Sequence, residues 1–277
     1  MTLSWKAKRR FWGAAWGCGV LCMTLALAWQ LGRPAGCRRQ DLTRIPDDSF
    51  AVTVRPVQAQ QQTGGAEEKR VFLTFDDGPS PTTEQVLDIL EREQVPATFF
   101  VIAAPNNEKY LPILKRTAAQ GHQIALHSCT HEYSQIYRSP AAYWADLRDL
   151  KQKLSPWVED AEEICWLRFP GGSTNTVSHR YGGRHIMTSL KAQAEERGYH
   201  YVDWNVCAGD AAGGHPSADR LLKNVIREAE GKTRCVVLMH DTKATGNTAQ
   251  ALPEIIRWFR EQGYRFCRID ALAQEET

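Results

Sequence analysis

Short apolar segments alternate with longer amphipathic stretches from about residue 70 to the end of the chain. The apolar segments are rich in Val, Ile, Phe and Tyr, which is typical of buried strands. They lie at 71–75, 97–102, 123–127, 164–169, 199–204, 235–239 and 264–269. The stretches between them predict helices at 82–93, 109–120, 140–154, 187–197, 217–230 and 249–262.

Residues that begin and end helices fall at the boundaries of these stretches. Ser80-Pro81 has the composition of an N-cap followed by proline at the first helical position. Gly121, Gly198 and Gly263 each end a helical stretch just before an apolar segment. Apolar strands separated by helices favour a parallel sheet that is covered by helices. We therefore expect an α/β fold, an irregular (β/α) barrel of about seven parallel strands with outer helices; an open doubly wound sheet is the alternative.

A membrane anchor or signal peptide is predicted at the amino terminus. Residues 1–10 form a basic head, and residues 11–32 carry no charge. At about 1.5 Å per residue, this uncharged stretch can cross a hydrocarbon core of about 30 Å. The basic head predicts a cytoplasmic start, with the rest of the chain outside the membrane. The alternative is a signal peptide cleaved after Ala26-Leu27-Ala28, which would release a secreted protein.

The charge distribution separates this head from the rest of the chain. Residues 1–40 contain seven Lys and Arg and no acidic residue, so the remainder has 27 basic against 32 acidic residues. A mildly acidic domain lacks the basic surface that nucleic-acid binding requires. Residues 33–69 contain the run QAQQQTGG and predict a flexible linker, which leaves 70–277 as the folded domain.

Five of the predicted strands end in polar motifs. These are TFDDG at 74–78, HSCTH at 127–131, RFPGG at 168–172, DW at 203–204 and LMH at 238–240. In parallel β/α folds, the loops after the strands converge on one edge of the sheet. We therefore expect the motifs to form a single site.

A metal site is the first chemistry that these motifs suggest. On a helical or turn-like segment, the i,i+4 spacing of His127 and His131 places both imidazoles on one face. Asp77 is the candidate third ligand, which leaves positions open for water and substrate. A pair of surface histidines is the alternative. Cys129 would point away from this face and is expected to be packed or disulfide-bonded.

Acid and base candidates lie beside the metal candidates. Two adjacent carboxylates, Asp76 and Asp77, are costly unless one binds a metal and the other a cation, although they could also form a simple turn. Arg168 could provide that cation, or be a surface arginine. His240 and Asp203 could be a structural pair, or a general acid with its orienting carboxylate.

As an ordered set, these motifs resemble the polysaccharide deacetylases of carbohydrate esterase family 4, over roughly residues 70–270. The resemblance implies that Asp76 is the catalytic base, held by Arg168. It implies that Asp77, His127 and His131 bind one divalent metal ion, with zinc expected and cobalt, manganese, nickel or iron as alternatives.

The same resemblance implies roles on the other side of the substrate. Asp203 would tune His240 as the general acid, and Trp204 and Leu238 would line the groove for the acetyl group and sugar. The backbone N–H of Gly171 would hold the oxyanion. Many members have an aromatic residue after the proline of the third motif, where this chain has Gly171-Gly172, so a sugar-stacking surface is expected to be missing.

The implied activity is hydrolysis of the N-acetyl group of amino sugars in a cell-wall polysaccharide. An outward-facing anchor favours an immobile polymer, so peptidoglycan N-acetylglucosamine is the expected substrate, and no obligate protein partner is expected. The alternatives are N-acetylmuramic acid, chitin oligomers, an exopolysaccharide or a small-molecule amide. A non-catalytic glycan-binding protein is a further alternative, but every candidate catalytic residue is present.

A disulfide is predicted between Cys129 and Cys207. Both cysteines follow predicted strand ends, whereas Cys165 and Cys235 lie at or near strand starts. A location outside the cytoplasm would permit oxidation. Two small buried thiols are the alternative.

Overall fold

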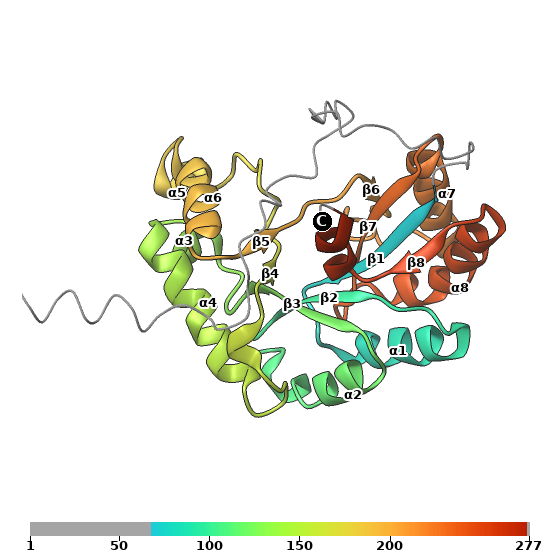
Figure 1. Cartoon of the computed structure of the whole chain (residues 1–277), viewed down its shortest axis with the longest axis horizontal. Coiled ribbons are helices and arrows are strands. Elements are labelled where there is room, and N and C mark those ends of the chain that lie inside the picture. The colour runs from blue at the N-terminus through green and yellow to red at the C-terminus, as the bar shows by residue number, and fades with distance from the viewer. Residues whose placement is uncertain (1–67, 276–277) are drawn as a thin grey trace, which may run out of the picture. The chain divides into compact units, whose positions relative to one another are not determined.

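A curled sheet of parallel strands, with helices on its convex side, forms the part of the chain that the computed structural model describes, residues 68–275 (Figure 1). The strands run in the order β5-β4-β3-β2-β1-β7-β6, and β8 pairs with the first half of β1. Every pairing is parallel. The sheet curls into a half-barrel in which β1 pairs with three strands, β2, β7 and β8.

The long strands lie in the middle of the sheet, and the strands toward its edges are short. The strands are β1 (Arg70–Asp76), β2 (Thr98–Ile102), β3 (Gln123–Ser128), β4 (Trp166–Leu167), β5 (His200–Tyr201), β6 (Val206–Cys207), β7 (Arg234–His240) and β8 (Arg265–Cys267). The α-helices are α1 (Pro81–Glu93), α2 (Ile113–Ala119), α3 (Tyr133–Ile136), α4 (Pro140–Leu154), α5 (His179–Gly182), α6 (Ile186–Glu196), α7 (Ala218–Ala229) and α8 (Gly246–Glu261). Turns of 3-10 helix lie at Glu108–Tyr110, Ala161–Glu163 and Ile269–Glu275.

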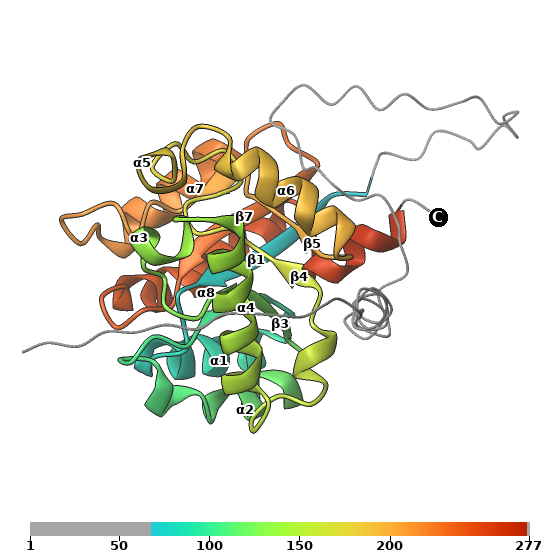
Figure 2. The ribbon, with the colours of Figure 1, turned by 90° about the vertical axis from the view of Figure 1, so that its left-hand side faces the viewer.

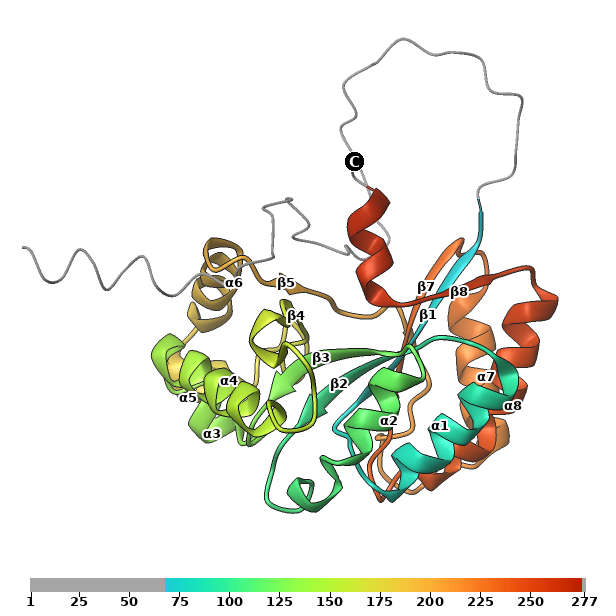
Figure 3. The ribbon, with the colours of Figure 1, turned by 60° about the horizontal axis from the view of Figure 1, so that its bottom comes forward.

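The alternation of side chains in β1 divides the core into two parts. Val71, Leu73 and Phe75 are buried in the large cluster formed with the helices. Phe72 belongs to a second, smaller cluster on the concave face, which Ile269 and Leu272 of the last 3-10 helix help to cover (Figure 3). Because side chains alternate between faces, Thr74 and Asp76 share the concave face with Phe72. The polar end of β1 is thereby directed into the half-barrel.

The helices pack against the convex face in chain order. α1 contacts both α2 and α8, and α7 packs against α8 (Figure 3). α4 packs against β3 and α6 (Figure 2). Helix α1 begins at the predicted cap, because the Ser80 hydroxyl accepts a hydrogen bond from the Thr82 N–H and Pro81 follows it.

The predicted irregular (β/α) barrel of parallel strands is confirmed as a half-barrel. All seven predicted strands occur, but β6 was not predicted, and within residues 68–275 the two end strands, β5 and β6, do not pair with each other. β4, β5 and β6 have two residues each, which is too few to form a long closing ladder. The short helices α3 and α5 were also not predicted, because four residues cannot establish a helical period.

The predicted head, anchor and most of the linker lie outside the described residues. In the described part, no helix is both long and apolar enough to cross a membrane. The predicted Cys129–Cys207 disulfide is wrong, because both cysteines are free thiols. Cys129 follows β3 and Cys207 ends β6, and these strands are separated in the sheet by β2, β1 and β7.

Candidate metal and catalytic site

Four predicted residues meet on the concave face, at the carboxyl ends of four strands. Asp76 ends β1, His240 ends β7, His127 lies in β3, and Arg168 directly follows β4. In each case the residue two positions earlier also faces the concave side, because side chains in a strand alternate between the two faces of the sheet. The alternation that buries the smaller apolar cluster on the concave face therefore also brings these four polar side chains together there.

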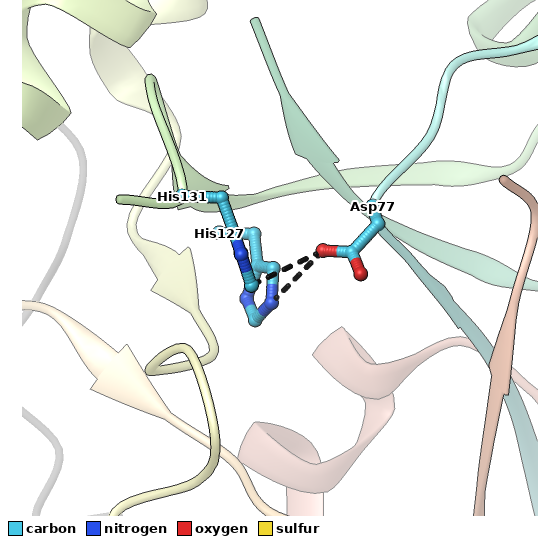
Figure 4. A group of neighbouring side chains, drawn as sticks. All are labelled: Asp77, His127 and His131. Atoms are coloured by element: carbon cyan, nitrogen blue, oxygen red, sulfur yellow. Dashed lines mark ion pairs between the residues drawn. The ribbon is translucent and has the colours of Figure 1, made fainter. Parts of the chain in front are cut away.

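Asp77, His127 and His131 form a candidate metal centre (Figure 4). Asp77 Oδ1 lies 3.5 Å from His127 Nε2 and 3.3 Å from His131 Nε2. The potential ligand atoms of all three residues lie within 4.8 Å of one another. This is the set predicted from the sequence, brought together from the ends of β1 and β3.

The hydrogen bond of His127 fixes which ring nitrogen faces the cluster. Its Nδ1 lies 2.7 Å from the backbone carbonyl oxygen of Arg168. A carbonyl can only accept, so Nδ1 carries the hydrogen and the lone pair of Nε2 is left toward Asp77. Burial lowers the pKa of His127 to about 3, so the imidazole is neutral, as a metal ligand must be.

The three side chains fit a divalent ion. Asp77 Oδ1 is buried and has no hydrogen-bond partner in the described part of the chain, an arrangement that is costly unless another group satisfies the oxygen. Two imidazole nitrogens and one carboxylate suit zinc and similar metals. Asp77 and His131 also have positive φ values, 69° and 57°, a conformation that costs free energy and is concentrated at functional sites.

The loop that carries His131 is held by Asp146 of α4. The Asp146 carboxylate accepts hydrogen bonds from the Ser128 hydroxyl and Cys129 N–H, both at 2.7 Å, and from the N–H and hydroxyl of Thr130. The Ser128 hydroxyl in turn accepts the His131 N–H at 2.8 Å. A buried carboxylate thus orders the segment between the two histidines.

Arg168 holds Asp76, as predicted, and is not the surface arginine of the alternative interpretation. Its side chain is fully buried, and Nη1 donates to Asp76 Oδ1 and to the Thr74 hydroxyl, both at 2.8 Å. The guanidinium carbon lies 4.2 Å from the centre of the Phe100 ring. Burial raises the pKa of Asp76 above its ordinary value, although the charges of Arg168 and His240 oppose this effect. Asp76 is therefore a stronger base than an exposed aspartate.

The turn after Asp77 requires glycine. A Cβ on Gly78 would collide with the carboxylate of Asp241, whose Oδ2 accepts a hydrogen bond from the Thr83 hydroxyl. The Gly78 carbonyl accepts the Ile102 N–H at 2.8 Å. These contacts fix the backbone that presents Asp77.

His240 pairs with Asp210, and the prediction that Asp203 would tune it is wrong. His240 Nδ1 lies 2.9 Å from Asp210 Oδ1, and its backbone N–H donates to Asp210 Oδ2 at 2.6 Å. Burial disfavours the charged ring, but the hydrogen bond and charge of Asp210, aided by Asp76, prevail and raise the pKa of His240 to about 9. His240 is thus a protonated acid at neutral pH.

Asp203 and Asp210 have different hydrogen-bond partners because they follow strands at opposite edges of the sheet. Asp203 follows β5, at the far end of the sheet from β7, whereas Asp210 follows β6, which pairs directly with β7. The Asp203 carboxylate instead accepts the N–H of Ser173 at 2.8 Å and its hydroxyl at 2.5 Å. Asp203 therefore holds the loop after β4. The only sequence signal for Asp210 was the short apolar run just before it.

Three predicted substrate contacts lie around these groups. Leu238 is inward-facing and buried on β7. Trp204 lies beside Gly172 and packs against the smaller cluster on the concave face. Gly171 is exposed, and its N–H has no hydrogen-bond acceptor within residues 68–275. Their contacts with a substrate stay predictions.

The chain is similar to known proteins over most of the residues that the structure describes. The family described as Polysaccharide deacetylase matches residues 63–189. A peptidoglycan-N-acetylglucosamine deacetylase of Bacillus cereus is 32% identical over 208 residues, covering 74% of this chain and 88% of the relative. The chain belongs to the polysaccharide deacetylase family.

Solved structures also match most of this chain. The catalytic domain of a peptidoglycan N-acetylglucosamine deacetylase from Eubacterium rectale is 36% identical with a TM-score of 0.69, covering 76% of this chain and 93% of that one. A Streptococcus mutans CE4 esterase is 31% identical with a TM-score of 0.63, covering 73% and 86%. The curled parallel sheet is thus the fold of this deacetylase family.

Proposed function

We propose that this polysaccharide deacetylase is a metal-dependent hydrolase that removes the N-acetyl group from N-acetylglucosamine in peptidoglycan. The observation that carries the proposal is a three-ligand cluster flanked by a buried base and a protonated acid. Asp76 Oδ2 lies 3.8 Å from His127 Nε2. The charge of His240 interacts with both Asp76 and Asp77. A candidate general base, Asp76, and a candidate general acid, His240, therefore lie beside the same three-ligand cluster.

Asp76 acts as the general base in this proposal. The hydrogen bond from Arg168 fixes Oδ1, which leaves Oδ2 on the side of His127. A carboxylate with a raised pKa accepts a proton from the attacking water more readily than an exposed one.

His240 acts as the general acid. Its Nδ1 is committed to Asp210, so Nε2 is the atom that delivers the proton. An amide nitrogen leaves poorly unless it is protonated, so hydrolysis of an acetamide requires such a donor. With its raised pKa, His240 carries that proton throughout the neutral range.

Asp77, His127 and His131 would hold the metal, with zinc proposed from the nitrogen and oxygen donors. When bound there, the ion would polarise the acetyl carbonyl as a Lewis acid. The exposed N–H of Gly171 would donate to the same carbonyl oxygen as negative charge develops on it.

The proposed substrate is supported by the names of the relatives, two of which act on peptidoglycan N-acetylglucosamine. The uncharged stretch 11–32 supports a location outside the cytoplasm, because it has the length of a membrane anchor. We propose a single-pass membrane protein whose domain faces the cell wall. A secreted form is the alternative.

Acetate release from a panel of glycans tests the proposal. The panel contains peptidoglycan, chitin oligomers and an N-acetylated exopolysaccharide, each with metal-stripped and zinc-restored protein. We expect release from peptidoglycan, with amines appearing on glucosamine units, only after metal is restored. Release from none of the glycans by the zinc-loaded protein would contradict the proposed function, and release confined to chitin oligomers would change the substrate.

A further inference from the structure

The hydroxyl of Tyr133 lies beside Gly171. A Cβ built on Gly171 would be 2.6 Å from Tyr133 Oη and 3.5 Å from Cε1 of the same ring. Gly171 has a φ of 78° and no side chain, so the backbone there can approach the phenol closely. The aromatic side chain beside Gly171 thus comes from α3.

Tyr133 also lies next to the candidate metal centre. Its ring packs edge-on against the His131 ring, with centroids 5.6 Å apart. The side chain is half-buried, so part of it remains accessible to a substrate. The hydroxyl makes no hydrogen bond within residues 68–275.

Tyr137, one helical turn later, provides a contrast. Its hydroxyl is fully buried and donates to the Pro170 carbonyl at 2.7 Å. This bond joins α3 to the loop that carries Gly171. Since Tyr137 stacks edge-on against Tyr133, with centroids 5.5 Å apart, the position of the Tyr133 ring relative to Gly171 is fixed by packing. One tyrosine of the pair holds the loop, and the other keeps a free donor at the site.

We infer that Tyr133 is a catalytic residue whose hydroxyl donates a second hydrogen bond to the acetyl oxygen, together with the Gly171 N–H. This inference rests on the proposed function. Charge grows on that oxygen as water attacks, so a donor already held in place stabilises the transition state more than the bound substrate. The phenol keeps its proton and returns to its starting state after each cycle.

Tyr133→Phe tests the inference, because phenylalanine keeps both ring contacts and removes only the hydroxyl. We expect kcat to fall by about 10²-fold, the order found when one oxyanion donor is removed. KM and the zinc content per protein should stay close to those of the parent protein. Ser139→Ala, which removes the N-cap hydroxyl of α4, is a control for a general loss of stability, measured as the melting temperature.

A double-mutant cycle with Gly171→Ala gives a second readout. In the parent protein the added methyl group collides with the Tyr133 hydroxyl, whereas in the Tyr133→Phe background the nearest ring atom is 3.5 Å away. Gly171→Ala should therefore reduce kcat by a smaller factor in that background.

The outcomes separate the inference from the proposed function. If the parent protein releases acetate and Tyr133→Phe has the same kcat, the inference is wrong and the function stands. A raised KM with unchanged kcat would also overturn it, because that pattern indicates ground-state binding alone. If the parent protein releases no acetate from any N-acetylated glycan, the proposed function itself fails.

Discussion

The two halves of the site are built in different ways. The metal half comes from the ends of two strands: Asp77 directly follows β1, His127 lies near the end of β3, and His131 lies in the loop after β3. The acid half joins His240 of β7 to Asp210, which follows the two-residue strand β6. The first half depends on local turns, and the second depends on which strand lies beside β7.

This difference affects how each half is supported. The metal half has a dedicated carboxylate, Asp146, that holds the histidine loop from α4. In the acid half, one carboxylate both orients His240 and sets its pKa. We therefore expect loss of Asp146 to change the metal affinity, and loss of Asp210 to change the pH profile of activity.

Removal of a ligand should have the largest effect. Asp77→Ala, His127→Ala and His131→Ala should each abolish stoichiometric zinc binding and acetate release, since two remaining ligands hold the ion poorly against water. Elemental analysis after gel filtration measures the zinc content. Asp76→Asn is the matched control and should keep its zinc; a fully loaded and active His127→Ala protein would show that the assigned centre is wrong.

Removal of the acid or the base should lower turnover without loss of metal. Asp76→Asn and His240→Ala should each lower kcat by about 10²-fold or more, because both groups act in the transition state. Steady-state kinetics on a zinc-loaded sample separates kcat from KM. Near-parental turnover by His240→Ala would remove the proposed proton donor.

Loss of the support for the metal half should have an intermediate effect. Asp146→Asn places an amide N–H₂ group among four hydrogen-bond donors, which should loosen the His131 loop and weaken zinc affinity by about 10- to 100-fold. Competition with a chelator measures the affinity, and excess zinc should restore activity. Asp149→Asn, an exposed position on the same helix, should leave the affinity unchanged. Equal affinities for the two variants would contradict this role of Asp146.

Loss of the pair between His240 and Asp210 should shift the pH profile of activity rather than abolish activity at neutral pH. His240 must be protonated to act, so kcat/KM should fall as the pH rises through the pKa of about 9. Asp210→Asn removes the charge that raises this pKa, and the alkaline limb should move to lower pH by about one to two units.

Asp203→Asn is the matched comparison, because the Asp203 carboxylate binds Ser173 and not His240. It should leave the alkaline limb in place. A shift caused by Asp203→Asn, with none caused by Asp210→Asn, would restore the pairing expected from the sequence.

The sequence by itself was sufficient for features that depend on local patterns. The central strands and the helix at 140–154 follow from alternation and capping, and the strand ends and histidine spacing indicated Asp77, His127 and His131 as a candidate metal cluster. These signals are strong because each involves residues within a few positions of one another, or a strand end whose edge of the sheet is fixed by parallel topology.

Only the tertiary structure decided which distant residues pair. The two-residue strand β6 is too short to show a period, yet it places Asp210 rather than Asp203 beside His240. The same holds for Asp146, which reaches the histidine loop from a helix, and for Cys129 and Cys207, which the strand order keeps apart. Such contacts depend on the order of strands and the packing of helices, which involve residues far apart in the chain and leave no local pattern.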